Sequence, residues 1–243
     1  MSPNSFAPSP RCHALIPCAG SGARLPGEVP KQYRTLQGDC VVQHTVRAFL
    51  RTPRIASVAV VVQAADTQAA ACLQLDPRLS LLPLGGATRA HSVLGGLDGL
   101  LRAGALPTDW VLVHDAARCC ITPELIDRLI DACATDPVGG LLALPLPDTL
   151  KTADTAGRVA RTEPREGRWL AQTPQMFRLG PLREALLAAI ALNAPPTDEA
   201  GAMERLGHMP LLVPGAAFNF KITYPQDLEL AQAVLAARSG GHP

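Results

Sequence analysis

The residues best suited to chemistry lie near the start of the chain, in a glycine-rich segment, residues 15–25, that reads LIPCAGSGARL. Its small side chains let backbone N–H groups approach an anion closely and adopt positive φ values. Arg24 and Lys31 add a guanidinium and an ammonium, which bind phosphate oxygens in complementary ways. The segment therefore predicts a loop that binds a polyphosphate. The alternative is an ordinary strand-to-helix turn with two solvated cations.

Spacing excludes two better-known nucleotide loops. The Walker pattern needs Gly-Lys followed by Ser or Thr at a fixed offset, and no such sequence follows Gly22. The dinucleotide fingerprint G-x-G-x-x-G is broken, because residues 23–26 read ARLP. The loop is therefore expected to hold its phosphates in another way, and an NAD-linked oxidoreductase is disfavoured.

A second charged group follows a short apolar strand. Residues 111–113 read VLV and lead directly into His114 and Asp115, with Arg118 three residues later. In a parallel sheet, ligands bind beyond the carboxyl ends of the strands, so this group is expected beside the glycine-rich loop. An aspartate there can hold Mg²⁺, whose shell is completed by water and substrate phosphate. Alternatively, Asp115 caps the next turn and pairs with Arg118.

Alternating strand-like and helix-like patterns position these groups. Apolar runs that favour strands lie at residues 14–17, 57–62, 110–113, 141–145 and 210–213. Apolar residues with helical spacing lie between them, at 42–50, 93–101 and 125–133, and a last helix begins near Pro225. Thr122 and Pro123 are the expected N-cap and first residue of the third helix. This order predicts an α/β fold, a mostly parallel sheet with helices on both faces.

Residues 146–175 differ in character from the rest of the chain. They are rich in polar residues and proline, and they include Arg161, Arg165 and Arg168. Such a stretch predicts a projecting β-arm that packs on a partner or closes over a site, and a solvated loop is the alternative.

Two further positions are candidates for contact with an anion. Thr197 opens the sequence TDEA, which is typical of a helix N-terminus, where exposed N–H groups favour anions. A simple helix cap is the commoner explanation of that sequence. Lys221 lies inside the apolar run NFKIT, so its ammonium needs an anion or must reach solvent.

Composition limits the class of protein. With 243 residues, 47% of them hydrophobic, the chain is long enough for one large domain spanning residues 1–243, preceded by a disordered tail over residues 1–12. The formal net charge of +1 gives no reason to expect nucleic acid or an anionic membrane as a partner. A membrane-spanning run and a secretion signal are both lacking in the sequence, which predicts a cytoplasmic protein.

The seven cysteines form no C-x-x-C pair and are odd in number. Neither a complete disulfide framework nor a zinc site is suggested, so reduced and mostly buried thiols are expected. Cys119 and Cys120 follow the charged group directly, but no base lies at a neighbouring position to activate either thiol.

Together these segments resemble one family over residues 14–235, the 2-C-methyl-D-erythritol 4-phosphate cytidylyltransferases of the non-mevalonate isoprenoid pathway. The shared segments, each weak alone but specific in combination, are in order PCAGSG with Arg24, PKQY, RAHSV, VHDAAR, DTLK, TPQ, TDEA and KIT. The resemblance implies a Rossmann-like nucleotidyltransferase fold that joins CTP to the phosphorylated sugar alcohol with loss of pyrophosphate.

The resemblance also assigns residues to roles. The nucleotide would be held by Cys18, Ala19, Gly20, Gly22, Gly86, Ser92 and Ala116. The acceptor substrate would be contacted by Asp115, Arg118, Thr149, Arg165 and Thr197. Arg24, Lys31 and Lys221 are the expected catalytic residues, which stabilise the transition state, and Asp115 would ligate Mg²⁺ or another divalent cation. Thr149 and Arg165 are expected from a neighbouring subunit, because the family is dimeric through the arm.

Two alternatives and two departures accompany the resemblance. A cytidylyltransferase acting on another polyol phosphate, such as ribitol 5-phosphate, would share the nucleotide half of the motifs. A nucleotide-binding regulatory protein would keep the fold without turnover, but the intact Arg24, Lys31, Asp115 and Lys221 weigh against it. Cys18 stands where alanine is usual and predicts a loop sensitive to oxidation. Cys119 stands where proline is common and removes no catalytic charge.

Overall fold

The computed structural model describes residues 9–20 and 29–239. Gly22, predicted to bind the nucleotide, and Arg24, predicted to be catalytic, lie outside the described residues, as does most of the predicted tail. The tail's last residues are ordered: Cys12 begins β1, and the backbone N–H of Arg11 donates to Asp109 at 2.9 Å.

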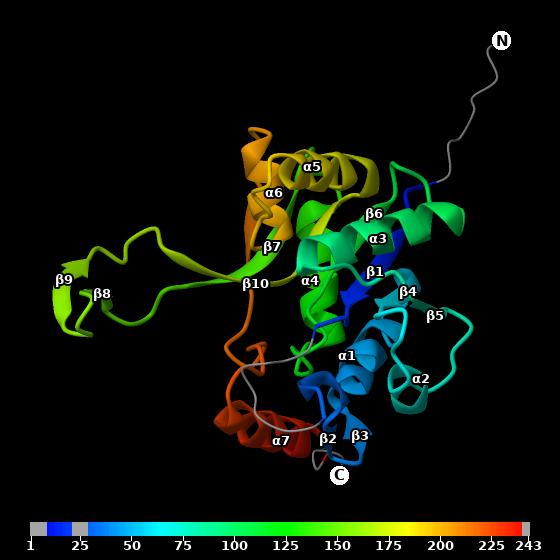
Figure 1. The fold of residues 1–243 in the computed structure, drawn as a ribbon, viewed down its shortest axis with the longest axis horizontal. Coiled ribbons are helices and arrows are strands. Elements are labelled where there is room, and N and C mark those ends of the chain that lie inside the picture. The colour runs from blue at the N-terminus through cyan, green and yellow to red at the C-terminus, as the bar shows by residue number, and fades with distance from the viewer. Residues whose placement is uncertain (1–8, 21–28, 240–243) are drawn as a thin grey trace.

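A seven-stranded sheet forms the centre of the molecule, with strand order β11-β7-β10-β6-β1-β4-β5 (Figure 1). The strands are β1 (Cys12–Pro17), β4 (Ile55–Val61), β5 (Leu79–Leu82), β6 (Trp110–Val113), β7 (Gly139–Pro145), β10 (Trp169–Arg178) and β11 (Leu211–Pro214). All pairs are parallel except those of β10, which runs antiparallel to both β6 and β7. The predicted mostly parallel sheet is confirmed.

Helices cover both faces of this sheet, as predicted. On one face lie α1 (Val41–Leu50) and α4 (Pro123–Cys133), and on the other α3 (Arg89–Arg102), α5 (Leu179–Ala191) and α6 (Glu199–Arg205). Side chains alternate along β1, so Ala14 and Ile16 pack in the first core and Leu15 in the second. The predicted start of α4 is confirmed, because the hydroxyl of Thr122 accepts the N–H of Leu125 and Pro123 is the first helical residue.

The remaining elements are short or lie outside the two main layers. They are η1 (Lys31–Tyr33), β2 (Thr35–Leu36), β3 (Asp39–Cys40), α2 (Ala69–Cys72) and α7 (Pro225–Ser239). A third apolar cluster packs α7 against the residues that follow β6, through Ala231, Ile222 and Cys120. It fixes Lys221, which immediately precedes Ile222, close to the carboxyl end of β6.

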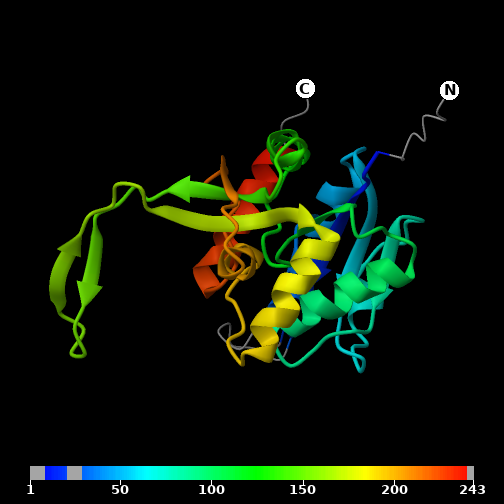
Figure 2. The same cartoon turned by 90° about the horizontal axis from the view of Figure 1, so that it is seen from above.

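The predicted arm is a hairpin of β8 (Leu150–Ala153) and β9 (Val159–Glu163), which pair antiparallel. It extends far from the body of the molecule, and Figure 2 shows it joined to the central sheet by the ends of β7 and β10. The C-terminal end of the stretch assigned to the arm behaves differently. Gln172, Thr173 and Gln175 are buried in the sheet as part of β10.

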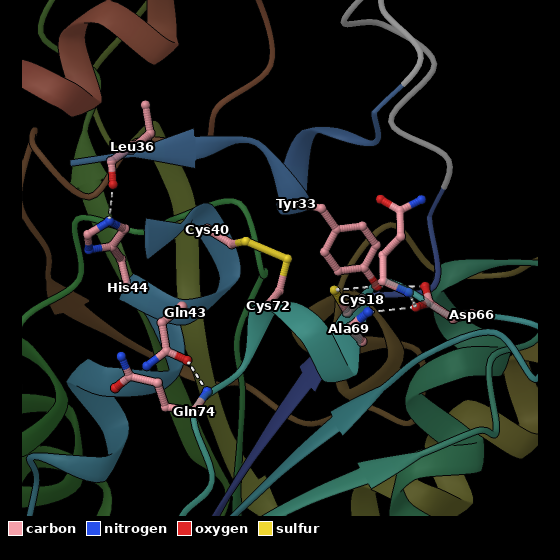
Figure 3. The surroundings of a disulfide bond; sticks show 11 residues. Cys18, Tyr33, Leu36, Cys40, Gln43, His44, Asp66, Ala69, Cys72 and Gln74 are labelled. Atoms are coloured by element: carbon pink, nitrogen blue, oxygen red, sulfur yellow. Dashed lines mark hydrogen bonds between the residues drawn. A yellow bond between two sulfur atoms is a disulfide. The ribbon is translucent and has the colours of Figure 1, made fainter. Parts of the chain in front are cut away.

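The expectation that all cysteines are reduced is wrong. Cys40 and Cys72 form a disulfide, with their Cα atoms 5.7 Å apart although 32 positions separate them in sequence (Figure 3). Cys40 is the N-cap of α1 and Cys72 ends α2, and the fold brings these helix ends together. A second contact joins the same parts, because the backbone N–H of Gln74 donates to Gln43 Oε1 at 3.0 Å. The other five cysteines are free and buried.

Candidate active site

A pocket of about 520 Å³ opens at the carboxyl ends of β1 and β6, where the sequence places the glycine-rich loop and the second charged group. Hydrogen bonds pair β1 with both β6 and β4, so the residues that follow these strands meet at one edge of the sheet. Six of the predicted nucleotide-binding residues line this pocket: Cys18, Ala19, Gly20, Gly86, Ser92 and Ala116.

Two glutamines hold the described part of the glycine-rich loop in place. The Gln32 amide donates to the carbonyls of Cys18 at 3.2 Å and Gly20 at 2.8 Å. The Gln63 amide donates to the carbonyl of Ala19 at 3.1 Å. Neither glutamine was predicted from the sequence to have a role, although Gln32 lies in the segment PKQY. With these carbonyls bonded to side chains, the described loop is fixed before any ligand arrives.

Gly86 lies against the first turn of α3, in a position where a side chain would clash with His91. A Cβ atom there would lie 2.4 Å from the Cβ of His91, so only glycine fits without movement. The N–H of Gly86 donates to the Ser92 hydroxyl at 3.1 Å, and that hydroxyl donates to the Thr88 carbonyl at 3.1 Å. Gly86 and Ser92 thus form one rigid side of the pocket.

The Cys18 thiol lies under the loop and is only 2% exposed. Burial raises its pKa to about 12, although a contact with the Tyr33 hydroxyl at 3.8 Å acts in the opposite direction. That hydroxyl in turn donates to Asp66 at 2.6 Å, as Figure 3 shows. Because oxidation proceeds through the thiolate, a buried and neutral thiol does not support the predicted sensitivity of this loop to oxidation.

Asp115 lies at the junction of the site, surrounded by three cations. Its Oδ1 accepts from Arg89 Nε at 3.1 Å, and its Oδ2 lies 2.9 Å from Lys221 Nζ and 3.4 Å from Arg118 Nε. Burial alone would raise the pKa of this carboxyl, but Arg89, Lys221 and Arg118 hold it well below its usual range. Asp115 is therefore ionised throughout the physiological range. The pairing with Arg118 that the sequence analysis kept as an alternative does occur, together with the two other ion pairs.

A smaller pocket of about 190 Å³ adjoins the first, and the two share Arg89, Asp115 and Lys221. Arg118 and Thr197 also line it, so together with Asp115 three of the residues expected to contact the acceptor come together here. The position of β10 explains the shape of this pocket. Gln175 pairs with Val113 of β6, so the buried part of β10, which begins at Gln172, runs beside Asp115.

The predicted catalytic lysines approach the larger pocket from different parts of the chain. Lys31 belongs to η1, and its Nζ donates to the carbonyl of Ile222 at 2.7 Å. Lys221 is the residue before Ile222, so this bond ties η1 to the segment that carries Lys221. Their charges line the same pocket as the glycine-rich loop.

Thr149 and Arg165 are not brought to these pockets within one protomer. Both are exposed on the arm, Thr149 just before β8 and Arg165 after β9. The Arg165 guanidinium donates to the carbonyl of Pro147 in the same arm. Their predicted contact with substrate stays a prediction that requires the arm of a second copy.

His114 helps to position Asp115 through Thr173, to which both residues are hydrogen-bonded, and it carries no charge. Its Nδ1 accepts from the Thr173 hydroxyl at 3.0 Å, and its Nε2 donates to the Arg118 carbonyl at 3.2 Å. The Thr173 oxygen also accepts the N–H of Asp115 at 3.1 Å. Complete burial lowers the pKa of His114 to about 3, so the ring is neutral and serves as structure rather than as a base.

Asp115 was predicted to ligate Mg²⁺, which proteins usually hold through one or two carboxylates, with water and substrate phosphates as further ligands. Among the described residues, no group of three or more His, Cys, Asp and Glu could hold a metal ion. Asp115 offers one carboxylate whose two oxygens already face Arg89, Arg118 and Lys221. It fits only as a single protein ligand to a cation that a bound polyphosphate brings with it.

Within residues 9–20 and 29–239, no helix is long and apolar enough to cross a membrane. The expectation of a cytoplasmic protein is compatible with this finding, which does not test it.

Known proteins match this chain over nearly its whole length. The family model for 2-C-methyl-D-erythritol 4-phosphate cytidylyltransferase (IspD) matches residues 12–237. The bifunctional enzyme IspD/IspF of Albidiferax ferrireducens is 58% identical over 96% of this chain, which spans only 55% of that longer protein. The 2-C-methyl-D-erythritol 4-phosphate cytidylyltransferase of Laribacter hongkongensis is 54% identical over 95% of this chain and 99% of its own length.

A solved structure gives the same answer for the fold. A crystal structure of 4-diphosphocytidyl-2C-methyl-D-erythritol synthase superposes with a TM-score of 0.82 and 41% identity, over 93% of this chain and 98% of that one. The chain therefore belongs to the 2-C-methyl-D-erythritol 4-phosphate cytidylyltransferase family.

Proposed function

We propose that this protein joins CTP and 2-C-methyl-D-erythritol 4-phosphate, forming 4-diphosphocytidyl-2-C-methyl-D-erythritol and pyrophosphate for isoprenoid precursor synthesis. The observation that carries the proposal is a pair of pockets that meet at Asp115, one lined by a glycine-rich loop and the other by cations. Two substrates bound in these pockets would meet at the residues the pockets share. Relatives with this name, 54% and 53% identical, support the same reaction.

The larger pocket is assigned to CTP. The backbone of Ala19 and Gly20 would face the phosphates. Gly86 and Ser92 would form the wall of a small rigid space suited to the pyrimidine. Gly22 and Arg24 are assigned to the same nucleotide from sequence alone. A cleft with fixed hydrogen-bonding groups discriminates between bases, because a wrong base leaves those buried groups unpaired.

The smaller pocket is assigned to the acceptor, whose phosphate would meet Arg118, Thr197 and Lys221. A phosphate oxygen of the acceptor attacks the α-phosphorus of CTP, and the bond from that phosphorus to the β-phosphate oxygen breaks. The electron pair leaves with pyrophosphate. The attacking oxygen is already ionised near neutral pH, so no general base is needed, in keeping with the neutral His114.

Electrostatic stabilisation is then the main task of the protein. Lys31, Lys221 and Arg24 are proposed to stabilise charge on the transferring phosphoryl group and on the departing pyrophosphate. Mg²⁺ bound to the polyphosphate would neutralise part of this charge, and Asp115 would supply at most one of its ligands. Thr149 and Arg165 would complete the acceptor pocket from the arm of a second copy, which makes the proposed enzyme a homodimer.

The proposal is tested by pyrophosphate release from CTP in the presence of Mg²⁺, with three parallel reactions. One contains 2-C-methyl-D-erythritol 4-phosphate, one contains ribitol 5-phosphate, and one contains no acceptor. We expect release only with the methylerythritol substrate. Faster release with ribitol 5-phosphate would contradict the assigned acceptor and keep the chemistry. Binding of CTP without release in any reaction would contradict the enzymatic role itself.

A further inference from the structure

Arg89 lies in the site but has no role in the assignments above. It is the first residue of α3, directly after the N-cap Thr88, and its side chain lines both pockets. Its guanidinium reaches two carboxylates on different elements, Asp115 after β6 and Glu199 at the start of α6. Arg89 thus joins the nucleotide side of the site to the acceptor side.

The contact with Glu199 is bidentate. Arg89 Nη1 donates to Oε1 at 2.6 Å and Nη2 to Oε2 at 3.0 Å, so the planes of the two groups are fixed against each other. The third nitrogen of the guanidinium, Nε, donates to Oδ1 of Asp115 at 3.1 Å. A lysine could carry the same charge but could not bond both carboxylates in this fork-shaped arrangement.

Glu199 is a firm anchor because it is buried and its helix is tied down. Its side chain is only 1% exposed. Gln175 of β10 holds the start of α6 at two points: its oxygen accepts the N–H of Ala200 at 2.7 Å, and its amide donates to Asp198 at 2.9 Å. The position of the guanidinium is therefore set by the sheet and not by solvent-exposed contacts.

The consequence concerns the two oxygens of Asp115. With Oδ1 bonded to Arg89, the carboxylate cannot rotate, and Oδ2 faces Lys221 and Arg118 on the acceptor side. Loss of Arg89 would leave Glu199 buried without its partner and would free Asp115 to draw Lys221 out of place. Both effects would misplace the cations around Asp115, of which Arg118 lines only the acceptor pocket and Lys221 lines both pockets. The bonds that hold the glycine-rich loop come from Gln32 and Gln63 and do not involve Arg89.

We propose that Arg89 is a positioning residue for the transfer reaction: anchored by Glu199, it fixes Asp115 so that Lys221 and Arg118 are held where the acceptor phosphate binds. This inference rests on the proposed function, since it concerns the acceptor of that reaction. It assigns to Arg89 and Glu199 a role in acceptor binding and turnover, with little effect on the binding of CTP.

The test compares Arg89→Lys and Glu199→Gln with the unchanged protein, using Glu204→Gln as a matched control on the exposed side of α6. The measurements are kcat, KM for the acceptor, the Kd for CTP by calorimetry, and Tm. Misplacement of catalytic groups by about 1 Å can cost a hundredfold, so we expect kcat to fall by about that factor in both variants. KM for the acceptor should rise, the Kd for CTP should stay within about threefold, and Glu204→Gln should behave as the unchanged protein.

A rescue experiment separates positioning from a purely structural role. In Arg89→Ala, methylguanidinium at low millimolar concentration should restore part of the lost kcat, whereas methylammonium should not, because only the planar ion can bridge both carboxylates. Normal kcat in Arg89→Lys would overturn the proposal, and so would an equal loss of CTP and acceptor binding. The unchanged protein's own turnover decides the proposed function separately, since all variants are compared with it.

Discussion

Lys31 Nζ donates to the carbonyl of Ile222, the residue that follows Lys221. This bond fixes the Lys31 ammonium in the wall of the larger pocket before substrate arrives. A charge that is already in place stabilises a transition state better than a mobile charge that must first move into position, because no reorganisation is needed during the reaction.

Replacing Lys31 by alanine should therefore slow the chemical step strongly. Loss of one preorganised donor raises the barrier by about 2 to 4 kcal/mol, and we expect kcat for Lys31→Ala to fall accordingly. Steady-state pyrophosphate release measures the effect. Arg102→Ala, which removes an exposed cation at the far end of α3, is the control and should leave kcat unchanged. Turnover of Lys31→Ala near that of the control would remove Lys31 from the catalytic group.

The buried His114 makes stability depend on pH in a defined window. Its folded-state pKa is lowered to about 3, so between about pH 3 and 6.5 the unfolded chain binds a proton that the folded chain does not. The free energy of unfolding should therefore fall as the pH is lowered from about 6.5, by about 1.4 kcal/mol for each pH unit. Asp115, whose pKa is lowered, contributes stability that is lost only at more acidic pH, below the usual range of a carboxyl.

Urea unfolding of the protein and of His114→Gln between about pH 5 and 7 tests this, because carboxylates stay ionised in that range. The difference in free energy of unfolding between the two proteins should shrink as the pH falls. His13, whose pKa burial also lowers, remains in both proteins and so does not alter the difference. Parallel curves would mean that His114 has the same pKa in the folded and the unfolded chain, and would contradict the lowered pKa.

Among the elements, α1 and α2 are joined by the disulfide of Cys40 and Cys72. The bond closes a long loop that contains all of β4, and cross-links of this length stabilise a domain by about 2 to 4 kcal/mol, chiefly by restricting the unfolded chain. The double variant Cys40→Ser/Cys72→Ser should lose stability of this order when measured without reductant.

Reductant provides the control for this prediction. Dithiothreitol should lower the Tm of the unchanged oxidised protein to that of the double variant and should not affect the double variant itself. If the two proteins have the same Tm without reductant, the disulfide does not stabilise the fold.

The sequence was most informative about elements whose pattern follows their burial. β6 and the apolar stripe of α4 were predicted because buried strands and helix faces are apolar. β10 was missed because its first residues are exposed and its buried part begins with polar residues, Gln172 and Thr173. Gln172 donates to the Ala216 carbonyl and Gln175 to Asp198, and these partners are distant in sequence. Helix α5 and strand β5 were also not assigned.

In the site, too, contacts between residues distant in sequence could not be predicted. Local motifs indicated Asp115, Arg118 and the glycine-rich loop, since each lies directly after a predicted strand. The pair of Arg89 and Glu199 joins residues 110 positions apart, and no local pattern predicts which opposite charges will meet. The disulfide was missed for the same reason, because only the fold brings its two cysteines together.

For the molecule as a whole, the position of Thr149 and Arg165 on the projecting arm predicts active sites shared between two copies. Mixing two inactive variants tests this. Arg165→Ala has a damaged arm, and Lys221→Ala has a damaged body. In a mixed dimer, the intact body of one copy meets the intact arm of the other, which restores one site of two.

Half of the dimers formed after dissociation and remixing of equal amounts are mixed. The mixture should therefore regain about a quarter of the activity of the unchanged protein, while each variant alone stays inactive. Size-exclusion chromatography confirms that both variants remain dimeric. No recovery on mixing would indicate that each site is built from a single copy.

The arm leaves and re-enters the body at neighbouring points. Pro145 of β7 lies opposite Trp169 of β10, and the N–H of Leu146 donates to the Arg168 carbonyl at 2.9 Å. The arm is therefore a separable module. We expect that residues 147–167 can be replaced by a tight turn, or exchanged for the arm of a relative, while the strands of the central sheet stay unchanged. We expect a chimaera made in this way to keep its own nucleotide pocket, because no residue between 147 and 167 lines either of the two pockets.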